Sequence, residues 1–405
     1  MPSRGSLSPA QAWLLAVACG LSVANVYYAH PLLDAMASDL GISRAAIGGV
    51  ISVTQAGSAL ALLVLVPLGD LLERRRLMAA QLLLLVGSLL LVALARQPWL
   101  TLLGMLGLGL LGTAMTQGLL AFAASLAGDA QRGRVLGLVQ GGVVVGLLLA
   151  RSLSGAMADL GGWRAVYLLS ALLMAALLPV LWRCLPALRS EAGLGYPALL
   201  RSMFVLLRED RVLQVRGVLA LLLFTVFNLF WAALVMPLSA PPLSLSPGAI
   251  GAFGLVGAVG ALAAARAGRW ADRGQAQRAS GLALALLALA WVPLAFTGQS
   301  LWALVLGILL LDAAGQALHV LNQSLVLGGG NPAHARLISL YMLFYAAGSA
   351  LGAFAATHLH ARAGWLGVCL AGGALSLLAL AFWWATLPGR NGIRHHVLGR
   401  QSGIR

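Results

Sequence analysis

The sequence has little charge. Only 9% of its 405 residues are charged, whereas about a quarter are charged in ordinary soluble domains. All 26 basic residues are arginine, and 60% of the chain is hydrophobic, with a mean hydropathy of +0.93. This composition excludes a soluble globular protein and indicates that a lipid bilayer is the solvent.

Cysteine is also scarce, and the familiar signatures of catalysis are missing. The cysteines Cys19, Cys184 and Cys369 are odd in number and lie in or beside apolar segments, so they predict neither a disulfide framework nor a metal site. We find no nucleotide-binding loop and no nucleophile, metal or cofactor pattern. We therefore expect no enzyme and no cofactor, and the only energy source that remains is an ion gradient such as that of protons.

The net charge of +15 would indicate nucleic acid as the partner of a soluble protein. Here, however, the arginines lie mainly in short connections between apolar runs, which is typical of membrane topology. The expected partners are the bilayer, protons and a small-molecule substrate, with no nucleic acid, and we expect a monomer.

Apolar segments long enough to cross a bilayer, about 20 residues each, recur along the whole chain. We predict twelve, at residues 10–32, 45–67, 77–95, 99–126, 135–157, 163–185, 213–237, 248–267, 279–297, 300–327, 337–359 and 364–386. The predicted fold is an all-α integral membrane protein with twelve transmembrane helices in two pseudo-symmetric six-helix bundles. The bundles are residues 1–185 and 213–387, joined by a connector at 186–212 that carries a short surface helix, and 388–405 form a basic tail.

The distribution of arginine orients the chain. Most arginines fall on one side if both termini, the connector and the turns after the second and eighth segments lie together, and only Arg44, Arg96, Arg164 and Arg362 then lie on the other side. The positive-inside rule makes the first side cytoplasmic. We predict a multi-pass protein of a bacterial cytoplasmic (inner) membrane with both termini in the cytoplasm.

An internal repeat supports the two-bundle prediction. Asp70 and Asp272 differ by 202 residues, and so do Trp163 and Trp365, each of which follows a glycine. Two parallel six-helix repeats are an arrangement that places a substrate site between them at the bilayer midplane.

The charged turn from Val66 to Arg76 carries a family resemblance. Asp70, Arg74 and Arg75 match the signature turn of the major facilitator superfamily, and Gly268, Asp272 and Arg273 repeat it in the second half. Over nearly its whole length the chain resembles the twelve-helix bacterial drug and metabolite:proton antiporters of that family, similar to arabinose and purine-nucleoside efflux permeases. Two departures are Val66, where the family usually has glycine, and a fourth segment without charge.

The resemblance implies that these six residues form a conformational latch on the cytoplasmic side. An aspartate at the N-terminus of a neighbouring helix would meet the positive end of its dipole. The alternative is a positive cluster that only fixes topology.

A polar stripe marks the tenth segment. Asp312, Gln316, His319 and Gln323 are spaced by four, three and four residues, which places them on one helical face that must find water or polar partners. Asp312 lies about 16 Å from the outer end of the segment, near the midplane. Since a low-dielectric site favours the neutral form of a carboxyl group, we predict that Asp312 couples transport to protons, with His319 as a second candidate. The alternatives are a structural partner for an arginine or amide, and a satisfied histidine.

Arg151 is the other intramembrane charge that we consider functional. It shares a helical face with Gln140 in a fifth segment whose glycines at 137, 141, 142, 146 and 155 predict close approach to a neighbour. Its side chain could instead extend to the outer interface, line the cavity for an anionic or hydroxylated substrate, or pair with Asp312. The predicted substrate-binding residues are Asn25, Tyr28, Gln55, Gln117, Gln140, Arg151, Asn228, Trp231, Gln316, Gln323, Tyr341 and Tyr345.

These features together predict a secondary active transporter that exports a small organic solute, such as a drug, sugar or nucleoside-like metabolite, by alternating access in exchange for protons. Multidrug resistance is the corresponding phenotype. The alternatives are a gradient-free facilitator of the same fold and a non-transporting membrane receptor or lipid scramblase.

Overall fold

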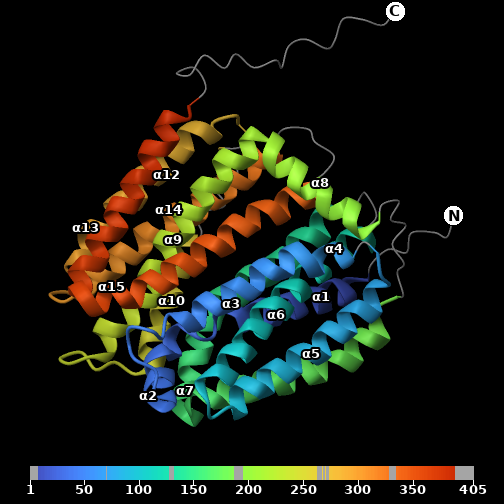
Figure 1. The fold of residues 1–405 in the computed structure, drawn as a ribbon, viewed down its shortest axis with the longest axis horizontal. Coiled ribbons are helices and arrows are strands. Elements are labelled where there is room, and N and C mark those ends of the chain that lie inside the picture. The colour runs from blue at the N-terminus through green and yellow to red at the C-terminus, as the bar shows by residue number, and fades with distance from the viewer. Residues whose placement is uncertain are drawn as a thin grey trace, which may run out of the picture.

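The computed structural model describes residues 8–69, 71–126, 132–186, 195–261, 267, 270, 273–327 and 334–387. This part of the chain is helical and contains no strand (Figure 1). The predicted all-α fold class is therefore confirmed.

The first half of the chain begins with a well-capped helix. The Ser8 hydroxyl accepts from the backbone N–H of Gln11, whose side chain bonds back to Ser8, and Pro9 occupies the first turn. The elements of this half are α1 (Pro9–Tyr27), η1 (His30–Leu32), α2 (Leu33–Leu40), α3 (Gly49–Leu60), the π-helical turn η2 (Ala61–Leu65), α4 (Val66–Leu68), α5 (Arg74–Leu94), α6 (Pro98–Leu126) and α7 (Arg132–Cys184).

The second half follows a short amphipathic helix, α8 (Tyr196–Glu209), which lies inside the predicted connector and buries Leu199 and Met203. Asp210 then caps α9 (Arg211–Ser239) by accepting from the backbone N–H of Leu213 at 2.9 Å. The remaining elements are α10 (Pro247–Ala261), α12 (Ala276–Leu289), α13 (Trp291–Ala295), α14 (Leu301–Leu327) and α15 (His334–Ala385).

Nine helical stretches of the described chain are long and apolar enough to cross a membrane, and α10 is a shorter apolar helix. Two of the nine, in α7 and α15, are about twice as long as one crossing requires. Each consists of two helices that meet at a single non-helical residue, Gly162 (φ 76°) in α7 and Gly364 (φ 61°) in α15. The two glycines differ by 202 residues, the predicted repeat offset. Counted in this way, the helices are consistent with twelve crossings.

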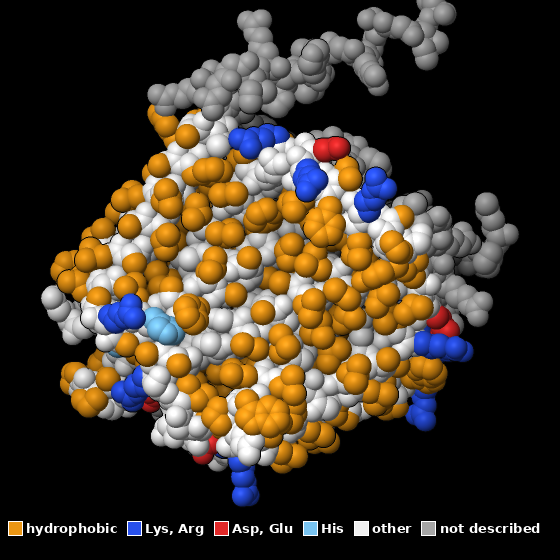
Figure 2. All heavy atoms as spheres, in the orientation of Figure 1, with side chains coloured by type: hydrophobic (Ala, Val, Ile, Leu, Met, Phe, Trp, Pro, Cys, Tyr) orange, Lys and Arg blue, Asp and Glu red, His pale blue; other side chains and the backbone are white. Residues whose placement is uncertain are grey.

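The surface is that of a membrane protein. Trp13, Leu84, Leu172 and Trp302 are among many large hydrophobic residues that are more than half exposed. Figure 2 shows hydrophobic side chains over the middle of the visible face and arginines toward its margins. The exposed apolar middle fits the lipid hydrocarbon, and the margins fit the headgroup region.

Glycines allow close helix packing in the first half. A Cβ atom on Gly142 would lie 2.1 Å from the carbonyl oxygen of Ala16, and one on Gly146 would lie 2.2 Å from that of Gly20, so α1 and α7 approach backbone to backbone. The predicted close approach is therefore confirmed for these glycines. It is wrong for Gly137 and Gly141, because no atom of a neighbouring helix lies within 4 Å of a Cβ position at either glycine.

The two predicted halves meet toward one end of the molecule, which we call the closed end, the end with residues 41–48, 159–163 and 240–247 (Figure 1). There Thr357 donates to the carbonyl of Ala45 at 2.6 Å, and Ser52 donates to that of Ala350 at 2.9 Å. Among the described residues, all hydrogen bonds between residues 8–185 and 213–387 lie from the middle of the bundle to this end.

Candidate functional site

Asp312 lies in the middle of α14 and is buried, with 2% of its surface exposed. Its Oδ2 atom has no hydrogen-bond partner. Gly257 of α10 packs against it so closely that a Cβ atom there would lie 2.8 Å from Oδ2. This carboxyl oxygen is therefore enclosed by the protein without a hydrogen-bond donor.

Arg151 of α7 is also buried, with 4% of its surface exposed, and it packs against Gly251 and Gly254 of α10. Its guanidinium carbon lies 4.3 Å from the ring centroid of Trp231 and 5.8 Å from that of Tyr27. The suggestion that this side chain extends to the outer interface is therefore wrong, since aromatic rings of α1 and α9 hold it in the interior. Arg151 interacts electrostatically with Asp312, but no nitrogen of the one lies within 4.0 Å of an oxygen of the other.

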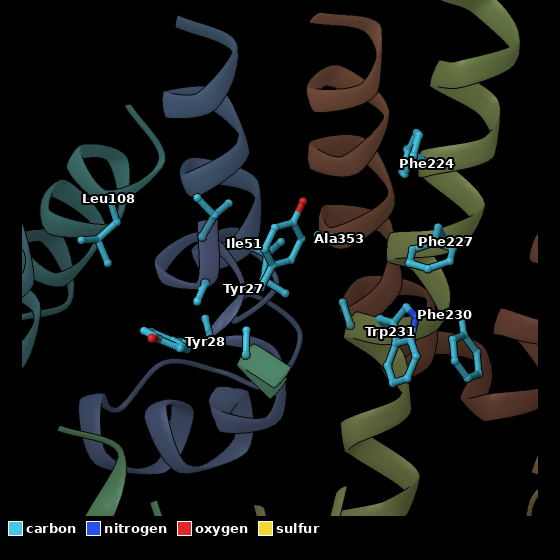
Figure 3. Packing of buried hydrophobic residues seen from close by; sticks show 14 of the residues in the cluster. Tyr27, Tyr28, Ile51, Leu108, Phe224, Phe227, Phe230, Trp231 and Ala353 are labelled. Atoms are coloured by element: carbon cyan, nitrogen blue, oxygen red, sulfur yellow. The ribbon is translucent and has the colours of Figure 1, made fainter. Parts of the chain in front are cut away.

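Aromatic and polar residues of both halves surround Arg151. The hydroxyl groups of Tyr27 and Tyr345 are hydrogen-bonded to each other, and His30 Nε2 lies 3.4 Å from Asn228 Oδ1. Figure 3 shows Tyr27 among the blue helices of the first half, and it shows Phe224, Phe227 and Trp231 one after another along α9. Tyr27 thus contacts Tyr345 of the other half, and the Arg151 guanidinium lies over the rings of both Tyr27 and Trp231.

The predicted stripe on α14 continues away from Asp312. His319 Nδ1 lies 2.9 Å from the hydroxyl oxygen of Tyr341, and Gln323 Nε2 lies 3.2 Å from His319 Nε2. The ring of Phe224 lies nearly perpendicular to the His319 imidazole, with 5.2 Å between the two ring centroids. His319, Gln323 and Tyr341 therefore form one hydrogen-bonded set, and Gln316 is half-buried between this set and Asp312.

A second polar cluster was not anticipated as a site. The buried Arg216 donates to Ser280 Oγ and to Asn322 Oδ1, both at 3.2 Å, and to Gln277 Oε1. From the sequence, Arg216 counts only as one of the arginines on the predicted cytoplasmic side, and His30 is not among the predicted site residues. An intramembrane polar residue was the available signal for both.

The remaining predicted binding residues are dispersed. Asn25 Oδ1 accepts from Ser170 at 2.6 Å, and Tyr28 packs against Tyr167, so both serve contacts inside the first half. Gln55 is buried, and its side chain lies against the Tyr27 hydroxyl group. Gln117 is half-buried, whereas Gln140 is exposed and lies outside the cluster around Arg151.

The predicted latch is only partly visible, because Asp70, Gly268 and Asp272 lie outside the described residues. Arg74 donates to the carbonyl of Ala121 at 2.8 Å, and the Arg75 guanidinium lies 4.6 Å from the ring centroid of Trp182. These contacts join helices of the first half. Arg273 is exposed in a turn, and the conformational role of the set remains a prediction.

Within the described ranges, no group of three or more His, Cys, Asp or Glu residues could hold a metal ion.

Comparison with known proteins gives the family. The model of the Major Facilitator Superfamily matches residues 13–329. The chain is 42% identical over 378 residues to the uncharacterised transporter YgaY of Escherichia coli K12, covering 93% of this chain and 96% of that protein. It is 34% identical over 375 residues to the transporter SCO4007 of Streptomyces coelicolor, covering 92% and 86% of the two chains.

A solved structure agrees in fold. A bacterial homologue of the human lysosomal transporter Spinster, in an inward-facing and unoccupied conformation, matches with a TM-score of 0.76 and 14% identity over 94% of this chain and 97% of that one. The family match, the two transporter relatives and the shared fold lead to one conclusion: this chain belongs to the major facilitator superfamily and is a membrane transporter.

Proposed function

We propose that the protein is a proton-coupled secondary transporter that exports a small organic solute across a bacterial cytoplasmic membrane. The observation that carries this proposal is the buried carboxyl group of Asp312, whose Oδ2 has no partner and which lies near Arg151 without an ion pair. Protonation of Asp312 alternates with solute binding. A proton that enters from outside then displaces the solute, and the proton gradient drives export.

The direction follows from the predicted topology. With both termini in the cytoplasm, the closed end faces outward, and the molecule is in the state from which a cytoplasmic solute enters. The predicted six-helix bundles separate and rejoin around the Arg151 and Asp312 region, and the predicted latch turns lie on the inner side.

The decisive variant is Asp312→Asn, which keeps the shape of the side chain and removes the titration. In proteoliposomes with an imposed pH gradient, a panel of metabolites and antibiotics identifies a transported solute for the wild type. We expect the variant to lose gradient-driven accumulation, by a factor of about ten or more, and to keep exchange of labelled for unlabelled solute. The matched control is Asp210→Asn, because asparagine caps a helix as well as aspartate does.

Full gradient-driven transport by Asp312→Asn would contradict the proposal. A gradient-free facilitator remains a second candidate, because Asp312 is the only buried acidic residue in the described part of the chain. Solute-induced proton flux measured with a pH-sensitive dye inside the vesicles separates the two functions, since a facilitator moves solute without moving protons.

A further inference from the structure

The two buried arginines of the described chain differ in their partners. Arg216 donates hydrogen bonds to the side-chain oxygens of Ser280, Asn322 and Gln277. Arg151 donates none to a described residue, and its Nε is buried without a partner. Since a buried donor that lacks an acceptor is costly, Arg216 is structurally complete and Arg151 is poised for a ligand.

The carboxyl group of Asp312 also lacks a hydrogen-bond partner, and it is an acceptor where Arg151 is a donor. Its Oδ2 is buried and unpartnered, and the Arg151 guanidinium does not reach it. The glycine face of α10 lies against both residues. A Cβ atom on Gly254 would lie 3.3 Å from Arg151 Cβ, and one on Gly257 would lie 2.8 Å from Asp312 Oδ2. Because both positions are glycine, no α10 side chain at these positions pairs with either charge.

A further unpartnered polar atom lies beside Arg151. The indole Nε1 of Trp231 is buried and makes no hydrogen bond. The rings of Trp231 and Tyr27 lie against the guanidinium. An arginine that is held by aromatic rings and keeps free N–H groups is suited to the two oxygens of a carboxylate.

We propose that the transported solute is a small zwitterion of the amino-acid class, with its carboxylate on Arg151 and its ammonium group on Asp312. A zwitterion adds no net charge to a site that already holds one buried cation and one buried anion. A solute with only one charge would leave an uncompensated charge in a low-dielectric interior. This inference rests on the proposed function, because protonation of Asp312 leaves the ammonium group without its partner and beside Arg151, and thereby releases the solute.

The test compares three matched ligand mixtures on purified protein in detergent, with thermal stabilisation as the readout. The mixtures are the free amino acids, their N-acetyl derivatives, which keep only the carboxylate, and their amides, which keep only the ammonium group. We expect the free amino acids to raise the melting temperature of the wild type, and about tenfold higher concentrations of either derivative to be needed for the same shift.

Two variants should reverse the preference in opposite directions. Asp312→Asn leaves Arg151 unbalanced, so the N-acetyl mixture should now stabilise best. Arg151→Gln leaves Asp312 unbalanced, so the amide mixture should stabilise best. Arg44→Gln serves as the control, because its ion pair with Asp34 is at the surface, and it should keep the wild-type order.

The outcomes are separable. An N-acetyl or amide mixture that stabilises the wild type as well as the free amino acids would overturn the zwitterion, and so would no shift with any mixture. The crossover in the two variants supports it. If free amino acids bind with this crossover but cause no proton flux in proteoliposomes, the ligand assignment stands and the proposed proton coupling fails.

Discussion

At the scale of single residues, the buried Arg151 and Arg216 carry the same charge but differ in their hydrogen bonds, because only Arg216 donates to neighbouring side chains. Replacing Arg216 by Met removes the donor from three side-chain oxygens, on Ser280, Asn322 and Gln277. We expect a loss of about 1–3 kcal/mol, since buried acceptors are then left unpaired. Arg151→Met leaves no hydrogen-bonded acceptor behind, so its effect on stability should be smaller and its effect on transport larger.

Thermal unfolding in detergent and transport in proteoliposomes together check this contrast. The prediction is that stability falls most in the Arg216 variant and that solute specificity changes most in the Arg151 variant. Equal losses of stability in both variants would mean that Arg151 is a structural residue, contrary to its lack of hydrogen-bond partners.

Much of the polar interior could be predicted residue by residue, because a polar group in an apolar helix is conspicuous. The spacing on α14 places His319 and Gln323 together, and the structure joins them through hydrogen bonds. The pairing of Tyr27 with Tyr345 could not be predicted, since the two lie 318 residues apart and aromatic residues in a membrane helix are as often packing or interface groups. Specific contacts between distant helices need the three-dimensional arrangement.

At the scale of secondary-structure elements, the contact between α7 and α10 depends on glycine. A Cβ atom on Gly155 would lie 2.3 Å from the carbonyl oxygen of Pro247. Gly155→Ala therefore forces the two helices apart at the closed end, with a strain of about 1–3 kcal/mol. We expect the equilibrium to shift toward the state open at that end by about fivefold or more.

The shift can be measured by placing a cysteine at Ser52, which contacts Ala350 at the closed end, and following its accessibility. The background is Cys184→Ser, which removes the exposed native thiol. A membrane-impermeant maleimide should label the introduced cysteine faster in Gly155→Ala than in the parent. Gly137→Ala is the matched control on the same helix, because nothing lies within 4 Å of its Cβ position. Equal labelling in all three proteins would show that α10 does not rest on Gly155.

The elements themselves were largely predictable, since hydrophobic length specifies a crossing and polar residues specify a connection. The helix in the connector, Tyr196–Glu209, also follows from apolar residues spaced three to four apart, such as Leu199 and Met203. The breaks are less predictable. The sequence predicts a connection between the fifth and sixth segments at residues 158–161. In the structure, α7 is helical over these residues and departs from helical geometry only at Gly162. A single glycine with positive φ is enough to redirect the chain, and no polar linker is required.

At the scale of the whole molecule, the hydrogen bonds across the predicted halves have one consequence for alternating access. If the closed end must open in each cycle, the contact between α3 and α15 must break. The Ser52 hydroxyl oxygen lies 2.9 Å from the carbonyl oxygen of Ala350, so cysteines that replace these two residues face each other across the contact. Oxidation of this pair should lock the closed end and reduce transport by about tenfold or more, and a reductant should restore it.

A second pair separates this effect from the general effect of a disulfide. Ser58 and Thr113 bring their hydroxyl groups within 2.9 Å, but they join α3 to α6 inside the first half. If each half moves as a unit, cross-linking them leaves transport unchanged. Transport that survives the Ser52–Ala350 cross-link would mean that the closed end never opens, and a loss with both cross-links would mean that the halves deform internally. Only a loss confined to the first pair fits two rigid bodies that rock about a site between Arg151 and Asp312.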